Sequence, residues 1–383
     1  MENNGRKKIL IAYVDSGAAH QSYSRTIINC LENNYPGRFI IKEMDYIKEL
    51  GPASLDRSQK NAWLFFLKHH YIGDFFYFLS ETIQPVMRAI VKFWSRKHIE
   101  NSARFLSGYK PDLIIAPHPV IMYFIALNLK KLGLKIPFIG IDIEPFEGGA
   151  VFAHPEADLT VVFSDIAKKK LVKRGVPEEK ISVYDFLVSQ KFLKDFEAPG
   201  VIRKRLGLKP DLLTIYMSSG GEGIGNIEKY IKTTVAEDLP VQLLVVTGRN
   251  EKLKKDLEAI KLPAGCKTAL KVLGYVNDVS DLIFMADMVF NKGGACSTIE
   301  TLFMKKPVMF YKYVMGNEKQ SVKFAVNNGL GWYVPTQKKY LDALREVLAD
   351  PAVLGQKKNN YAKFDFKNGT VNLCKNIAET LGN

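Results

Sequence analysis

The chain has 383 residues, enough for two domains of ordinary size, because single hydrophobic cores stop growing at about 250 to 300 residues. Hydrophobic residues make up 47% of the sequence and charged residues 25%, which excludes a disordered or fibrous protein. Lys and Arg exceed Asp and Glu by 54 − 40 = 14, and this excess favours a polyanionic partner: nucleic acid, anionic lipid headgroups or a phosphorylated substrate.

Four cysteines lie far apart, at Cys30, Cys266, Cys296 and Cys374. Their spacing indicates neither a zinc site nor a disulfide framework, and it fits a reducing cytoplasm. The first apolar run, residues 9–14, is too short for a signal peptide or a membrane span. The longest uncharged stretch, residues 113–129, contains two prolines and is typical of strand, turn and helix. We therefore expect any membrane association to be peripheral.

Short apolar runs alternate with longer helical patterns, which predicts an α/β protein with parallel strands and crossover helices. The strands expected in the first half are residues 8–14, 39–44, 113–116, 138–143 and 159–163. Those expected in the second half are residues 213–217, 241–246, 271–273, 288–291 and 308–311.

A polar stretch, residues 195–210, separates the two sets of strands and predicts two Rossmann-like domains with a ligand cleft between them. The expected domains are residues 1–198 and residues 199–365. Residues 366–383 are expected to form a helix that packs back on the first domain.

A histidine, His20, follows the first predicted strand and begins a helix. Ligands of open parallel sheets bind beyond the carboxyl ends of the strands, and an imidazole there is suited to accept a proton near neutral pH. His20 is therefore a candidate general base, with a capping or core histidine as the alternative. His118 and His154 also follow apolar runs, and we expect structural roles for both.

Aromatic residues are dense between Trp63 and Trp94, where ten occur, and basic residues flank them from Lys60 to Arg104. Aromatic side chains with a cationic fringe, in segments too short to span a bilayer, are typical of an interfacial helix pair. The alternative is a buried crossover helix. The residues expected at the membrane are Trp63, Phe65, Phe66, Lys68, Arg88, Lys92, Trp94 and Arg96.

Two carboxylates, Asp142 and Glu144, end another predicted strand. We expect them to orient His20 or to line the acceptor site. As a metal-binding pair they are a weak signal.

Two glycine-rich turns follow strands in the second half, at residues 218–225 and 292–297, and a helical pattern follows each. Such turns aim backbone N–H groups and the positive end of a helix at a ligand, which suits a pyrophosphate. Glu300, a turn into the second helix, offers an acceptor for ribose hydroxyls. The alternatives are ligand-free tight turns and a solvated helix carboxylate.

The stretch NKGGACSTIETLFMKKPVMFYKYVMGNEKQSVKFAVNNGLGWYV resembles the donor-site signature of glycosyltransferase family 28, in its monogalactosyldiacylglycerol synthase and processive diacylglycerol glucosyltransferase branch. The segments MSSGGEGIGNIEKYI, VVTGRNEKL and VLGYVNDVSDLIFMADMVF precede it in the family's order. The resemblance covers most of residues 213–335 densely and the first domain more thinly. It implies a GT-B fold, in which residues 1–198 bind the acceptor and the membrane and residues 199–365 bind a uridine diphosphate (UDP) sugar donor. It also implies no metal or other cofactor, because GT-B enzymes of this kind mostly use helix dipoles and side chains in place of a bound cation.

The resemblance assigns donor contacts to individual positions. It places Gly220, Gly221 and Gly223, with Ser219 and Gly248, around the first turn; Gly274, Tyr275 and Val276 at the uracil; Gly293, Gly294 and Ser297 at the phosphates; Glu300 at the ribose; and Gly316, Asn317, Glu318 and Lys319 near the hexose. Asn317 replaces the family's glutamine, so the hexose stays open between glucose and galactose.

The family has a Gly-Gly-Gly-His turn after its first strand, and its histidine is the proposed base. Ala18 and Ala19 stand where the family has glycines, and their methyl groups keep ligand atoms further from the backbone of this loop. The base role needs only the imidazole of His20.

Together these features predict an inverting hexosyltransferase that is peripheral to the cytoplasmic face of an anionic membrane, with UDP-glucose or UDP-galactose as donor and diacylglycerol or a related lipid as acceptor. The rivals are a UDP-sugar epimerase on the same scaffold and a non-catalytic, membrane-associated nucleotide-sugar sensor. A nucleic-acid partner is not expected, because no recognition motif accompanies the charge.

Overall fold

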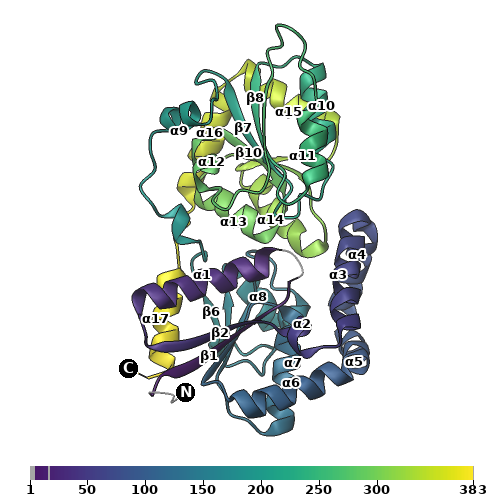
Figure 1. Ribbon diagram of the computed structural model, residues 1–383, viewed down its shortest axis with the longest axis vertical. Helices are drawn as coiled ribbons and strands as arrows, with labels where there is room; N and C mark the ends of the chain where they lie inside the picture. The colour runs from purple at the N-terminus through teal and green to yellow at the C-terminus, as the bar shows by residue number, and fades with distance from the viewer. Residues whose placement is uncertain (1–4, 16–17, 383) are drawn as a thin grey trace. The chain divides into compact units, whose positions relative to one another are not determined.

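The computed structural model describes residues 5–15 and 18–382, and these residues form two compact units (Figure 1). The first unit comprises Met1–Val188, Met315–Asn317 and Lys367–Asn383; the second comprises Ser189–Val314 and Glu318–Phe366. The α/β class is confirmed, since each unit contains one parallel six-stranded sheet with helices around it. The chain passes to the second unit after Val188, ten residues before the boundary expected from the sequence (198 − 188).

The sheet of the first unit has the strand order β2-β1-β3-β4-β5-β6. Its strands are β1 (Lys7–Tyr13), β2 (Phe39–Asp45), β3 (Leu113–Ala116), β4 (Phe138–Ile141), β5 (Leu159–Val162) and β6 (Ile181–Val183). β3 and β4 are buried along their whole length, because helices cover both faces of a parallel sheet.

Most helices of the first unit lie between these strands in the sequence. They are α1 (Ala18–Asn34), α2 (Tyr46–Leu50), α3 (Ala53–Lys68), α4 (His70–Thr82), α5 (Gln84–Trp94), α6 (Arg96–Tyr109), α7 (Pro119–Leu132), α8 (Asp165–Lys173) and α17 (Thr370–Thr380), with 3-10 turns η1 (Ala150–Phe152), η2 (Glu178–Lys180) and, at the start of the second unit, η3 (Gln190–Phe192). In place of one interfacial helix pair, the aromatic stretch forms α3, α4 and α5. In Figure 1, α3 and α4 run side by side.

Helix α17 packs on α1 within the first unit. The Cys30 thiol lies 3.7 Å from the Thr370 carbonyl oxygen, and the Cys374 thiol lies 3.8 Å from the Ile27 carbonyl oxygen. Arg38 closes the far end of α17 by donating to the Ala378 carbonyl at 3.0 Å, as suits a cation at a helix C-terminus.

The sheet of the second unit has the order β12-β11-β10-β7-β8-β9. Its strands are β7 (Leu213–Ser218), β8 (Val241–Val246), β9 (Ala269–Leu273), β10 (Met288–Lys292), β11 (Val308–Lys312) and β12 (Gly331–Tyr333). The remaining helices are α9 (Pro199–Arg205), α10 (Ile227–Ala236), α11 (Glu251–Glu258), α12 (Ser280–Met285), α13 (Ala295–Phe303), α14 (Gly316–Asn327), α15 (Gln337–Ala349), α16 (Ala352–Asn360) and the turn η4 (Tyr361–Lys363).

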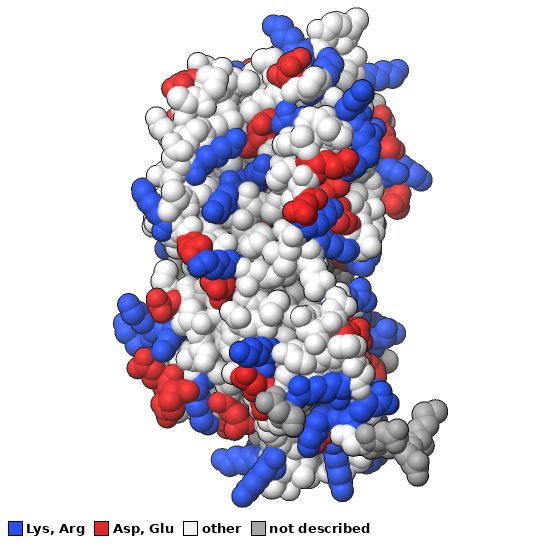
Figure 2. Space-filling model, turned by 90° about the vertical axis from the view of Figure 1, so that its left-hand side faces the viewer, with Lys and Arg blue, Asp and Glu red and all other residues white. Residues whose placement is uncertain are grey.

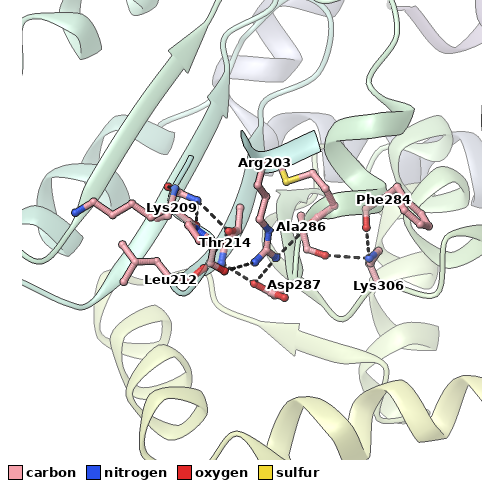
Figure 3. Close-up of polar contacts among 11 residues, drawn as sticks. Arg203, Lys209, Leu212, Thr214, Phe284, Ala286, Asp287 and Lys306 are labelled. Atoms are coloured by element: carbon pink, nitrogen blue, oxygen red, sulfur yellow. Dashed lines mark hydrogen bonds and ion pairs between the residues drawn. The ribbon is translucent and has the colours of Figure 1, made fainter. Parts of the chain in front are cut away.

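A polar cluster fastens α9 to the amino ends of the strands in the second unit (Figure 3). The Arg203 guanidinium lies 2.9 Å from the Asp287 carboxylate, which also accepts the Thr214 N–H at 2.8 Å. Lys306 donates to the carbonyls of Phe284 and Ala286, and burial lowers its pKa to about 8. These contacts lie at the edge of the sheet opposite the glycine turns, so their role is structural.

Charges of both signs are spread over the face that Figure 2 draws, with Lys and Arg interspersed among Asp and Glu. The excess of positive charge is therefore not gathered into one field on that face.

Candidate active site

His20 lies in the first turn of α1, directly beyond the carboxyl end of β1. Its Nδ1 lies 2.6 Å from the carbonyl oxygen of Pro117, which follows the neighbouring strand β3. A carbonyl oxygen only accepts, so Nδ1 carries the proton and Nε2 keeps its lone pair. Burial lowers the pKa of His20 to about 4, against the opposing effect of the Pro117 hydrogen bond. The imidazole is therefore neutral at physiological pH and able to accept a proton at Nε2.

His118 lies beside His20, with ring centroids 4.4 Å apart. Its Nδ1 accepts the backbone N–H of Val120 at 3.2 Å and caps α7. His154 is buried, and its Nε2 lies 3.1 Å from the Val151 carbonyl oxygen. Both histidines thus have the structural roles expected from the sequence.

Asp142 and Glu144 begin the loop after β4, and both side chains are buried. Asp142 Oδ1 accepts the N–H of Glu144 at 3.0 Å, whereas Asp142 Oδ2 has no hydrogen-bond partner among the described residues. Burial, together with the nearby charge of Glu147, raises the pKa of Asp142 to about 8. At neutral pH Asp142 is a protonated carboxyl, which offers a hydrogen-bond donor as well as an acceptor. The structure shows no hydrogen bond from Asp142 to His20 in the described part of the chain.

The loop between β1 and α1 is only partly described. Ser16 and Gly17 lie outside the described residues, as does the side chain of Ala18. The side chain of Lys68, at the end of α3, also lies outside them. The effect of the alanines at positions 18 and 19 stays a prediction.

The first glycine turn, residues 218–225, packs against the loop after β8. Arg249 donates its N–H to the Gly221 carbonyl at 2.8 Å, and a β-carbon added to Gly248 would lie 2.3 Å from that oxygen. Gly223 has φ +60°, and an added β-carbon would lie 1.9 Å from the Thr247 carbonyl oxygen. Gly223 and Gly248 are thus required by the close approach of two loops, whether or not a ligand binds.

Other polar groups of this turn are also engaged within the protein. The N–H of Gly220 donates to Ser218 Oγ at 3.1 Å, and the N–H of Gly223 donates to the Gly220 carbonyl at 2.9 Å. The Ser219 hydroxyl is buried and lies 3.0 Å from the Tyr311 hydroxyl. These groups are engaged within the protein, and the donor contacts expected for this turn stay a prediction.

The second glycine turn joins β10 to α13 and is the better anion site. Gly294 is the N-cap of α13 and provides no side-chain cap, so the positive end of the helix has no capping side chain. The Ser297 hydroxyl donates to the Gly294 carbonyl at 3.1 Å. A β-carbon on Gly293 would lie 2.6 Å from Val322, so the turn packs tightly against α14.

Glu300 is half-buried on α13, and its carboxylate has no hydrogen-bond partner among the described residues. Burial, with a smaller effect from the charge of Asp278, raises the pKa of Glu300 to about 8. A half-buried carboxyl with open acceptors is suited to bind a pair of hydroxyl groups.

Tyr275, in the loop after β9, is 55% exposed, and the Arg249 guanidinium lies 5.1 Å from its ring centroid. Arg249 also pairs with Glu222 at 2.7 Å. Gly274 and Val276 are the sequence neighbours of Tyr275, and Arg249 links the Tyr275 ring to Glu222 of the first glycine turn.

Two residues expected near the hexose, Asn317 and Glu318, form hydrogen bonds within the protein. Glu318 is buried, and its carboxylate accepts the N–H of Val314 at 2.6 Å, which shapes the loop before α14. Asn317 is grouped with the first unit, where its side-chain amide donates to Glu144 at 2.8 Å.

Lys292, the last residue of β10, lies beside both glycine turns, although the sequence reasoning did not single it out. Its Cε would lie 3.3 Å from a β-carbon on Gly220 and 3.8 Å from one on Gly294, so this side chain lies between the two glycine turns. Lys312 pairs with Lys292 in register on β11, and burial and the charge of Lys292 lower its pKa. A lysine directly before a glycine pair at the end of a strand is the signal that could have identified it.

The aromatic helices α3, α4 and α5 expose large apolar side chains. The most exposed are Tyr71 (79%), Trp94 (77%), Phe93 (65%) and Phe78 (60%). Lys92 and Arg96 are exposed beside them, Phe65 is exposed, and Trp63 and Phe66 are half-buried. An apolar surface of this size is typical of an interaction site.

Arg88 does not have the membrane-facing position expected for it. Its guanidinium donates to the Ala153 carbonyl at 2.7 Å and lies 5.7 Å from the Tyr123 ring centroid. This cation is used within the first unit, because its helix position places it on the face of α5 opposite Phe93.

In the described part of the chain, no helix combines the length and apolarity needed to cross a membrane. Within the same residues, no cluster of three or more His, Cys, Asp or Glu side chains is arranged to hold a metal ion.

Comparison with known proteins bears on the assignment. Residues 20–186 match the family model "Monogalactosyldiacylglycerol (MGDG) synthase". The chain is 24% identical to processive diacylglycerol beta-glucosyltransferase of Bacillus subtilis, over 98% of this chain and 95% of that protein. It is also 24% identical to the chloroplastic monogalactosyldiacylglycerol synthase of Spinacia oleracea, over 88% of this chain and 66% of that protein. The chain is a glycosyltransferase, and its residues 20–186 are similar to monogalactosyldiacylglycerol synthase. The resemblance predicted from the sequence is thereby confirmed.

Solved structures show the fold of this glycosyltransferase. Acinetobacter baumannii MurG has a TM-score of 0.60 at 12% identity, covering 97% of this chain and 99% of that one. The UDP complex of S. aureus MnaA has a TM-score of 0.62 at 14% identity, covering 97% and 94%. The predicted GT-B fold is confirmed.

Proposed function

We propose that this glycosyltransferase moves a hexose from a UDP-sugar to the free hydroxyl of diacylglycerol, with inversion, at an anionic membrane surface. The main support for a lipid acceptor is that one unit contains both His20 and the exposed aromatic faces of α4 and α5. The relatives named for diacylglycerol and monogalactosyldiacylglycerol support the same acceptor class. Solved structures of similar fold, S. aureus MnaA with UDP and Anabaena HepE with UDP and glucose, support the donor class.

The proposed reaction has one displacement step. His20 Nε2 takes the proton of the acceptor hydroxyl as its oxygen attacks the anomeric carbon, and the bond from that carbon to the UDP oxygen breaks. Lys292 and the start of α13 stabilise the departing diphosphate, because both place positive charge where negative charge develops. Asp142 and Glu144 hold the acceptor.

A transfer assay tests this function. The protein is incubated with radiolabelled UDP-glucose or UDP-galactose and liposomes of diacylglycerol and phosphatidylglycerol, and label in the extracted lipid is counted. Transfer from either donor supports the proposal. Conversion of the sugar by the protein with donor alone would identify an epimerase instead, and UDP binding without transfer or epimerisation would identify a sensor.

Replacing Glu300 by Ala should weaken UDP binding by about 1 to 3 kcal/mol, because the ribose hydroxyls lose a half-buried acceptor. Isothermal titration calorimetry measures the change. Glu346→Ala, an exposed helical glutamate of the same unit, is the control and should bind UDP as the wild type does. Equal affinity of the Glu300 and Glu346 variants would remove Glu300 from the ribose site.

The affinity for UDP should rise with pH between about pH 7 and about pH 8 and then level off. Hydroxyl donors favour the ionised form of Glu300, whose pKa of about 8 in the free protein leaves it mostly protonated at neutral pH. Binding therefore releases protons, and higher pH favours it. Glu300→Gln should abolish the slope; an unchanged slope in that variant would assign the proton release to another group.

A further inference from the structure

Helices α4 and α5 carry two different faces. The outer face is apolar and exposed, and it includes Ile72, Phe75, Phe78, Val86, Ile90, Phe93 and Trp94. The inner face is polar, with residues at successive spacings of four, three and four: Tyr77, Glu81, Gln84 and Arg88. A spacing of four places Tyr77 and Glu81 on one side of α4, and Gln84 and Arg88 on one side of α5. These four polar residues are termed the inner stripe.

Every residue of the inner stripe contacts the loop that follows Glu144. The Tyr77 hydroxyl donates to Glu147 at 2.8 Å, and Lys170 of α8 pairs with the other oxygen of that carboxylate at 3.0 Å. Glu147 is only 5% exposed, and burial together with its negative charge raises the pKa of Tyr77. The phenol therefore stays protonated and keeps donating.

The next residues of the stripe fasten the loop further along. The Glu81 carboxylate accepts the N–H of Ala150 at 2.6 Å and pairs with Arg174. Gln84 donates to the Ala150 carbonyl, and Arg88 donates to the Ala153 carbonyl.

This loop is also the one that begins with the candidate acceptor residues. Asp142 and Glu144 lie three to five residues before Glu147, and the charge of Glu147 acts on Asp142 directly. No residue of α5, which is described throughout, is buried. The polar stripe is thus the main connection between the aromatic helices and the acceptor loop.

We propose that Tyr77 and Glu81 are positioning residues that couple lipid docking of α4 and α5 to the arrangement of the acceptor loop, residues 142–154. Docking the outer face on a bilayer stabilises one placement of the helices, and the inner stripe passes that preference to the loop. Coupling of this kind is reciprocal, so an ordered loop also favours docking. The inference rests on the proposed membrane function.

Tyr77→Phe tests the coupling, because it removes only the hydroxyl that binds Glu147. On diacylglycerol in phosphatidylglycerol liposomes we expect kcat to fall roughly tenfold, the effect of losing one hydrogen bond to a charged group. The KM for the UDP-sugar should stay unchanged. Hydrogen exchange is the second readout: liposomes should protect backbone amides of residues 142–154 in the wild type, and much less so in Tyr77→Phe.

Tyr35→Phe is the matched control, since Tyr35 lies in the same unit and its hydroxyl has no hydrogen bond among the described residues. Glu81→Gln is the second variant; it loses the charge that pairs with Arg174, keeps an acceptor for Ala150, and should change both readouts in the same direction. If Tyr77→Phe does not fold stably, the kcat and the loop protection of Glu81→Gln test the coupling instead.

The outcomes separate the inference from the function beneath it. A wild type that neither sediments with liposomes nor transfers sugar overturns the proposed function and the coupling together. A wild type that does both, with Tyr77→Phe and Glu81→Gln equal to it in kcat and in loop protection, overturns the coupling alone.

Discussion

Replacing His20 by Ala is expected to reduce turnover by about a hundredfold or more and to leave UDP binding unchanged. The acceptor hydroxyl of a lipid is a weak nucleophile until its proton is removed, and Nε2 of His20 is a neutral acceptor fixed by the bond from Nδ1–H to Pro117. Turnover is measured with labelled donor and diacylglycerol liposomes, and UDP binding by calorimetry. Arg25→Ala, an exposed change on the same helix, is the control.

The pH profile of the wild type supplies an independent check on His20. A base acts in its unprotonated form, so kcat/KM should stay level from neutral pH down to about pH 5 and fall below the pKa of about 4. Turnover of the His20 variant within a few fold of the wild type would assign the base to another group.

Changing four exposed cations together to Ser should weaken binding to phosphatidylglycerol liposomes roughly a hundredfold to a thousandfold at low salt. The four are Lys92, Arg96, Lys97 and Arg104. Each basic residue near an anionic surface contributes about 1 kcal/mol, and salt screens this contribution. Arg88 is left intact because it bonds to the Ala153 carbonyl. Sedimentation with liposomes at several salt concentrations measures the effect.

The matched control removes the same charge elsewhere, by changing to Ser the exposed lysines of the second unit Lys252, Lys255, Lys261 and Lys339. Its sedimentation should stay close to that of the wild type. Replacing Phe78, Phe93 and Trp94 by Ser should weaken docking at high salt as well, since aromatic burial is not screened. Equal sedimentation of all variants at every lipid composition would show that α3–α5 do not dock on lipid.

Much of the fold follows from the sequence, because strands buried on both faces produce continuous apolar runs. Ten strands were predicted within a few residues of their observed ends. The two that were missed, β6 (Ile181–Val183) and β12 (Gly331–Tyr333), are three-residue strands at sheet edges. Three residues are too few to show a period.

The site was less accessible to sequence reasoning. The sequence indicated His20, Glu300 and the second glycine turn, since each follows a strand. It gave no sign that the Ser219 hydroxyl bonds to Tyr311, because those partners are 92 residues apart. The inward direction of Arg88 likewise depends on Ala153, which lies 65 residues further along the chain. Contacts this distant arise from packing and not from local pattern.

The grouping of α17 with α1 means that the first unit is discontinuous in sequence, since the second unit is inserted before residues 367–383. During synthesis domains generally fold as units in order from the N-terminus. Here the face of α1 that contains Ile27, Cys30 and Leu31 stays uncovered until the whole second unit has been made. The second unit is therefore free to finish folding while the first still waits for α17, and a chain ended at Val188 would leave this apolar face permanently open to aggregation.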